Sequence, residues 1–113
     1  MPSNMSQAFL HQLVLPSEEV AEGVRRQILG YNSTLMTVKV SFEKGAVGEL
    51  HHHPHSQTSY LASGKFEVTI DDHTEILSAG DSFYVAPDLI HGVICLEAGV
   101  LIDSFSPMRA DFL

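Results

Sequence analysis

The sequence predicts an all-β domain, built as a barrel or a sandwich of short strands. Two segments, residues 34–42 and 65–71, alternate apolar and polar residues with the period of two that is typical of a half-buried strand. Their apolar faces comprise Met36, Val38, Val40 and Phe42 in the first segment and Phe66, Val68 and Ile70 in the second. Turn-forming residues recur at short intervals, at Glu43-Lys44-Gly45, Ser63-Gly64, Asp71-Asp72, Ala79-Gly80-Asp81, Pro87-Asp88 and Glu97-Ala98-Gly99. Short strands separated by frequent turns indicate a sandwich or a barrel.

The segment before residue 34 has a weaker pattern. A helix fits residues 17–22, because Ser17 can cap it and the acidic residues that follow favour its first turn; a strand fits about as well. We place the barrel core at residues 34–107. Residues 1–20 are expected to form an N-terminal arm, which includes the apolar segment 9–15. Such an arm can add a strand to its own sheet or to that of a partner, since an unpaired edge is hazardous. We therefore expect a homodimer.

Size and composition exclude several classes of protein. A chain of 113 residues forms one domain and buries about two-thirds of its unfolded surface. Fourteen acidic and six basic side chains give a net charge of −8, which disfavours nucleic acid and anionic membranes as partners. Cys95 is the sole cysteine, so no internal disulfide can form. Residues 1–7 lack the features of a signal peptide and no apolar run reaches membrane-spanning length, so we expect a cytoplasmic protein.

A histidine-rich segment carries the strongest functional signal. It reads Gly-x5-His-x-His-x3-Gln-x6-Gly from Gly45 to Gly64. Side chains at i and i+2 leave the same face of a strand, so His51 and His53 are expected to point to one side together. Gln57 follows four residues later, after a bend at the intervening proline, and can supply an amide oxygen.

A further imidazole comes from His91, which only the fold can bring to the others. Imidazole and amide ligands suit divalent transition metals, and we expect one such ion: nickel, zinc, iron, manganese or cobalt. The predicted ligands are His51, His53, Gln57 and His91. Two alternatives stay open: Gln57 only hydrogen-bonds beside a three-histidine site, or the histidine run is a surface loop that binds metal opportunistically. The flanking glycines and the offset of the glutamine favour the metal site.

These residues resemble the two motifs of the cupin superfamily, whose members are double-stranded β-helix jelly-roll barrels. The first motif matches with Gln57 in the place of a glutamate. The second motif, Gly-x5-Pro-x-Gly-x2-His-x3-Asn, matches at Gly80 and His91. It departs at Ala86, Asp88 and Cys95.

A closer resemblance is to the single-domain cupins called pectin degradation proteins. It is carried by residues 22–26, 35–36, 53–57 and 103–113, and in that family glutamine also replaces the glutamate. The resemblance implies a metal-dependent isomerase or lyase-type enzyme that opens the ring of 4,5-unsaturated uronates from pectin or alginate, with a small anionic sugar as its partner. The alternatives are a cupin dioxygenase or other isomerase, and a cupin that binds a sugar acid or a metal without catalysis.

Residues near the C-terminus add candidates for the pocket. Leu101, Asp103 and Phe105 share one face of an expected strand, and an inward Asp103 would be a candidate general acid or base. Spacing alone leaves an outward, solvated aspartate equally open. The resemblance implies the inward orientation, because the counterparts of Asp103, Phe105 and Arg109 are implicated in the active site. Arg109 could hold a substrate carboxylate in bidentate fashion.

The remaining residues considered for the site lie within or after the first motif. Ser59 shares the face of the predicted amide ligand and is expected to line the pocket, whereas Tyr60 is expected to point away. His55 is expected at the rim of the pocket rather than on the metal. His52 and His73 are expected to be solvated.

Overall fold

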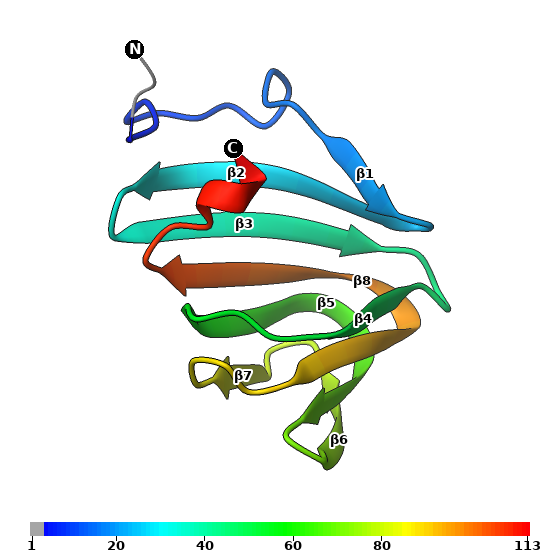
Figure 1. Cartoon of the computed structure of the whole chain (residues 1–113). Helices are drawn as coiled ribbons and strands as arrows, with labels where there is room; N and C mark the ends of the chain where they lie inside the picture. Colours follow the sequence, from blue (N-terminus) through cyan, green and yellow to red (C-terminus); the bar gives the residue numbers. More distant parts are fainter. Residues whose placement is uncertain (1–3) are drawn as a thin grey trace.

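The computed structural model describes residues 4–113, which form a single antiparallel sheet of eight strands that coils into a barrel (Figure 1). The strands are β1 (Glu18–Ala21), β2 (Val24–Asn32), β3 (Leu35–Phe42), β4 (Val47–His51), β5 (Ser56–Ile70), β6 (His73–Ser78), β7 (Ser82–Val85) and β8 (His91–Ser106). A short 3-10 turn, η1 (Ala110–Phe112), follows the last strand. The predicted all-β jelly-roll fold is confirmed.

The two longest strands organise the barrel. β5 and β8 pair along their whole length, from Ser56 opposite Ser106 to Ile70 opposite His91. The first half of β8 also pairs with β4 and its second half with β3, while β5 pairs with β7 and then with β6. Each long strand therefore passes from one part of the barrel wall to the other.

The turns predicted at Ser63-Gly64 and Glu97-Ala98-Gly99 are instead bends within β5 and β8. The register of the β5–β8 pair shifts at Ser63 and Lys65, on either side of Gly64, which has a φ of 84°. A Cβ atom at this position would lie 2.6 Å from the Cα of Gly99. Glycine is needed here because the two backbones approach closely and because L-residues rarely adopt this φ.

The N-terminal segment forms a strand rather than a helix. β1 pairs with β2 so that Glu18 lies opposite Arg26 and Glu19 opposite Arg25. Opposite charges on facing strand positions favour this pairing over a single helical turn. The sheet thus begins at β1, before the expected core boundary at residue 34.

The core fills the barrel with the predicted apolar faces. Phe42 and Phe66 pack edge to face with ring centroids 5.1 Å apart, beside the buried Cys95. A second cluster contains Met36 and Val38, both fully buried, at the end of the barrel where the C-terminal segment packs.

The N-terminal arm leaves apolar side chains exposed. Ser6 exchanges hydrogen bonds with Tyr31 of β2, which holds the arm against the edge of the sheet. Phe9 and Leu13 remain 82% and 95% exposed, and the homodimer stays a prediction. The expectation that residues 1–7 are not a signal peptide falls partly on residues 1–3, which lie outside the described residues. Within residues 4–113, no helix is long and apolar enough to cross a membrane.

Candidate metal centre and ligand pocket

Three histidines meet at one mouth of the barrel. His51 ends β4 and His91 begins β8, and the two residues are register partners, while His53 comes from the loop after β4. The ring centroids of His51 and His91 are 4.3 Å apart, and those of His53 and His91 are 4.9 Å apart. Each ring offers a nitrogen within 4.8 Å of the others. This cluster forms a site suited to one divalent metal ion.

Backbone carbonyls orient all three rings in the same way. The Nδ1 atom of each histidine lies within hydrogen-bond distance of a main-chain oxygen two residues away. The pairs are His51 with Glu49 at 2.8 Å, His53 with His55 at 3.2 Å and His91 with Leu89 at 3.0 Å. A neutral imidazole that donates from Nδ1 presents the lone pair of Nε2, which is the arrangement of a metal ligand. The buried Nε2 of His91 has no hydrogen-bond partner among the described residues, so a metal ion would satisfy it.

The position of Gln57 also fits a metal ligand. Its Oε1 lies 2.9 Å from Nε2 of His53, and its Nε2 donates to Ser59 Oγ at 2.9 Å. When His53 is neutral and donates from Nδ1, its Nε2 and the amide oxygen are both acceptors and cannot bond each other. Ligands at about 2.1 Å from one ion, and at right angles to each other, lie about 3 Å apart. The 2.9 Å between His53 Nε2 and Gln57 Oε1 therefore fits two ligands of one metal ion.

Burial keeps two of the imidazoles neutral. Desolvation lowers the pKa of His91 to about 4, because the charged ring would lose its hydration inside the barrel. Desolvation also lowers the pKa of His53, although the contact with Gln57 opposes this effect. Metal ligands must be deprotonated, so both rings are in the required form at neutral pH.

A chain of hydrogen bonds leads from the metal centre to Asp103. Ser59 receives the amide proton of Gln57 and donates its own to Asp103 Oδ1 at 2.6 Å. Asp103 lies inward on β8 and is 8% exposed. Burial raises the pKa of Asp103 from its ordinary 3.8 to about 6, against the lowering effects of the Ser59 hydrogen bond and the charge of Arg109.

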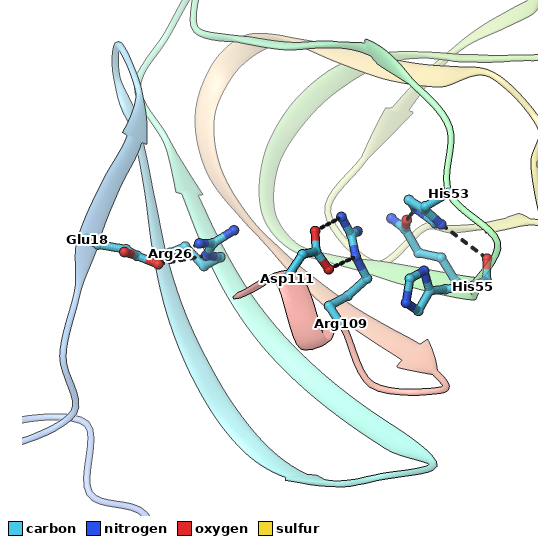
Figure 2. A network of polar contacts seen from close by, with 7 residues as sticks. Glu18, Arg26, His53, His55, Arg109 and Asp111 are labelled. Atoms are coloured by element: carbon cyan, nitrogen blue, oxygen red, sulfur yellow. Dashed lines mark hydrogen bonds and ion pairs between the residues drawn. The ribbon is translucent and has the colours of Figure 1, made fainter. Parts of the chain in front are cut away.

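The C-terminal segment closes one side of the pocket. Arg109 is buried, and its Nε and Nη2 donate to the two carboxylate oxygens of Asp111 at 3.0 and 2.8 Å (Figure 2). Its guanidinium lies over the Phe112 ring, 4.2 Å from the centroid, and 5.1 Å from that of Phe105. The arginine is thereby fixed between aromatic rings and an acidic partner.

The remaining predicted residues are arranged around this centre. Ser59 is buried, whereas Tyr60 is half-exposed on the outer face. The His55 ring packs against those of His53 and Phe105, at centroid distances of 5.3 and 6.4 Å, and Figure 2 shows it directed toward the side of Arg109. Its buried Nδ1 has no hydrogen-bond partner within residues 4–113. Two further histidines, His52 and His73, are exposed.

A cavity of about 180 Å³ lies beside the histidine cluster; neither Ser59 nor His55 is among its lining residues. Its walls are mostly apolar, and its polar lining residues are Arg26, His51, Gln57, His91, Asp103 and Arg109. A larger depression of about 550 Å³ lies around Gly23 and Gly45, away from the histidines. Drug-sized ligands fill pockets of roughly 300–1,000 Å³, so the histidine-lined cavity suits a ligand as small as a monosaccharide. Arg26 was not among the predicted site residues.

A jelly-roll barrel with a cluster of three histidines suited to a divalent metal ion is the architecture of a cupin. Residues 38–104 match the family model described as a cupin domain, and the chain belongs to the cupin family. It is 48% identical over 100 residues to the pectin degradation protein KdgF of Dickeya dadantii (strain 3937), covering 87% of this chain and 91% of that protein.

Two solved structures are similar over nearly the whole chain. An RmlC-like cupin from Shewanella frigidimarina NCIMB 400 superposes with a TM-score of 0.94 at 45% identity, covering 97% of this chain and 99% of the other. KdgF from Halomonas sp. superposes with a TM-score of 0.90 at 36% identity, covering 96% and 100%. The predicted resemblance to the pectin degradation proteins is confirmed.

Proposed function

We propose that this protein is a metal-dependent enzyme that opens the ring of 4,5-unsaturated uronate monosaccharides released from pectin or alginate. The observation that carries the proposal is the meeting of three groups in one small cavity: two histidines of the cluster (His51 and His91), the buried Asp103 and the buried Arg109. The similarity to proteins named for pectin degradation supports the choice of substrate.

The metal centre would supply a Lewis acid. His51, His53, His91 and Gln57 are neutral donors, so an ion bound by them keeps its full positive charge. Such an ion, whether nickel, zinc, iron, manganese or cobalt, polarises a substrate oxygen when bound. The reaction is an isomerisation without electron transfer, so a metal of fixed valence suffices.

Arg109 would bind the substrate carboxylate. A guanidinium matches a carboxylate with parallel N–H groups, and the aromatic contacts of this side chain restrict its rotation. Phe105 provides an apolar wall beside it, and His55, whose ring packs against Phe105, would lie at the rim. The sugar is thereby oriented with its ring toward Asp103.

Asp103 would move the proton. Ring opening breaks the bond between C1 and the ring oxygen, converts the C1 hydroxyl to a carbonyl and leaves an enol at C5. The enol becomes a ketone when its hydroxyl loses a proton and C4 gains one, so no proton is gained or lost overall. A carboxyl with a pKa of about 6 can accept and return a proton near neutral pH. The Ser59 hydroxyl holds this carboxyl in place.

The test is turnover of purified unsaturated galacturonate and unsaturated mannuronate, followed as loss of the absorbance of the 4,5-double bond. We expect loss faster than the spontaneous rate, abolished by a chelator and restored by one divalent metal. Asp103→Ala and Arg109→Ala should each lose activity, while Asp72→Asn in the exposed β5–β6 turn should retain it. Wild-type protein with bound metal that does not exceed the spontaneous rate would refute the proposal.

A further inference from the structure

We propose that Arg26 is a second anion-binding residue of this pocket, which shares the ligand carboxylate with Arg109 and so determines the preference for acidic over neutral sugars. The inference rests on the proposed function and deepens it, because it assigns substrate selection to a side chain on the wall opposite the histidines.

The register of the sheet turns Arg26 inward. It lies opposite Val40, which in turn lies opposite Leu101, and both of these apolar residues face the core. Its side chain is 17% exposed and lines the same cavity as Asp103 and Arg109. The preceding residue, Arg25, is exposed on the other face of β2, where it bonds Ser17. The two neighbouring arginines therefore face different environments.

Arg26 and Arg109 are each held by an acidic side chain. Arg26 donates from Nε and Nη2 to one oxygen of Glu18, Oε1, whereas Arg109 donates from the same two atoms to both carboxylate oxygens of Asp111 (Figure 2). Both guanidinium groups lie over the ring of Phe112, at 3.8 and 4.2 Å from its centroid. In the hydrogen bonds of the described residues, each arginine thus uses the Nε and Nη2 edge. A guanidinium carries five N–H donors, so three remain on each arginine, two on Nη1 and one on Nη2, and they offer a parallel pair to a ligand carboxylate.

The charges favour an anion in the cavity that the two arginines line. Their acidic partners, Glu18 and Asp111, are 55% and 59% exposed, so water screens their effect on the guanidinium groups. Two of the three arginines in a chain of net charge −8 line this one cavity. A carboxylate has two oxygens and can accept N–H groups from two guanidinium groups at once. A neutral sugar offers no charge to compensate for the desolvation of the pair.

The experiment measures binding by isothermal titration calorimetry of metal-loaded protein, with D-galacturonate and D-galactose as probes. We expect the wild type to prefer galacturonate, and Arg26→Gln to weaken its binding by roughly tenfold or more, the effect of losing a charged hydrogen bond. Metal content should be unchanged, and binding of galactose should change little. In turnover of unsaturated galacturonate, Arg26→Gln should raise KM with kcat largely kept, which is the signature of lost uniform binding.

Two matched variants separate direct binding from a structural role. Arg25→Gln removes the same charge from the adjacent position and should bind galacturonate like the wild type. Glu18→Gln removes the charge from the ion pair between β1 and β2 but keeps an oxygen that can accept the two N–H groups of Arg26, so Arg26 stays held and binding should be retained. Equal losses in Glu18→Gln and Arg26→Gln would mean that Arg26 only ties the strands together, and would overturn the inference.

The outcomes also separate this inference from the proposed function. Arg26-dependent binding of galacturonate without turnover would refute the enzyme and support the anion site. Turnover with an unchanged KM in Arg26→Gln would support the enzyme and overturn the anion site. Equal affinity of the wild type for galacturonate and galactose would overturn the anion site as well.

Discussion

Replacing Asp103 with asparagine should stabilise the metal-free protein at neutral pH. Burial raises the pKa of this carboxyl from 3.8 to about 6, so ionising it costs more in the folded than in the unfolded state. The pKa of Asp103 in the folded state is thus about two units above its value in the unfolded state. At 1.36 kcal/mol for each pKa unit, this difference corresponds to about 3 kcal/mol. Asparagine avoids this cost and still offers an oxygen to the Ser59 hydroxyl.

The sign of the effect depends on pH. Because the pKa is raised in the folded state, the unfolded chain releases its proton first as the pH rises. The folded protein therefore has its full stability with respect to this group below about pH 4, where Asp103 is protonated in both states. The free energy of unfolding then falls progressively as the pH rises to about 6. The advantage of Asp103→Asn should therefore be near zero at pH 4 and reach about 3 kcal/mol at pH 7.5.

Urea unfolding followed by circular dichroism at both pH values gives the free energies of unfolding. The protein must first be dialysed against a chelator, because a bound metal stabilises the fold and its charge favours the ionised carboxyl. Asp72→Asn, in the exposed turn between β5 and β6, controls for the loss of one negative charge. An equal gain at both pH values would point to packing, and no gain at pH 7.5 would refute the assignment of a costly buried carboxylate.

Three further predictions test the metal centre, the carboxylate site and the bend in the barrel wall. His91→Ala should abolish the rise in Tm on adding a divalent metal, a rise that in the wild type corresponds to about 2.7 kcal/mol at a metal concentration 100 times Kd; thermal scans with and without metal check it, and an undiminished rise would remove His91 from the site. Arg109→Lys keeps the charge but loses the paired donors, so KM for unsaturated galacturonate should rise roughly tenfold in steady-state assays; an unchanged KM would contradict the bidentate contact. Gly64→Ala should lower the free energy of unfolding by roughly 1–3 kcal/mol in urea titrations, because the added Cβ meets Gly99 Cα at 2.6 Å and φ is 84°; wild-type stability would show that the bend can relax.

The sequence allowed prediction of features that depend on local pattern. β3 follows the alternation of residues 34–42, because one face of that strand packs against the core and the other does not. The spacing of His51 and His53 was informative even though His53 lies beyond the end of β4, since the short loop continues the same direction. Local pattern does not reveal strand partners. The bends at Ser63-Gly64 and Glu97-Ala98-Gly99 therefore read as chain reversals, although each lies within a strand whose pairing continues past it.

Arg26 illustrates a different limit. The inward positions of β2 include Val24, Arg26 and Ile28, and a charged residue among apolar ones obscures the period of two. An arginine at an inward position is the useful signal, but it becomes visible only when the neighbouring residues are known to form a strand. The partners that make this position favourable, Glu18 and Phe112, come from opposite ends of the chain and meet only in the folded barrel.

The buried Asp103 favours the proposed enzyme over a protein that only binds sugar acids. A negative charge inside the cavity opposes the binding of an anionic ligand, and its desolvation also lowers the stability of the fold at neutral pH. A binding protein would gain on both counts from asparagine at this position. In the proposed mechanism the carboxyl accepts and returns a proton beside the bound sugar, and its pKa of about 6 suits that exchange. The same proposal gives the two arginines at the pocket wall a role: their charge would compensate for the aspartate and hold the anionic ligand beside it.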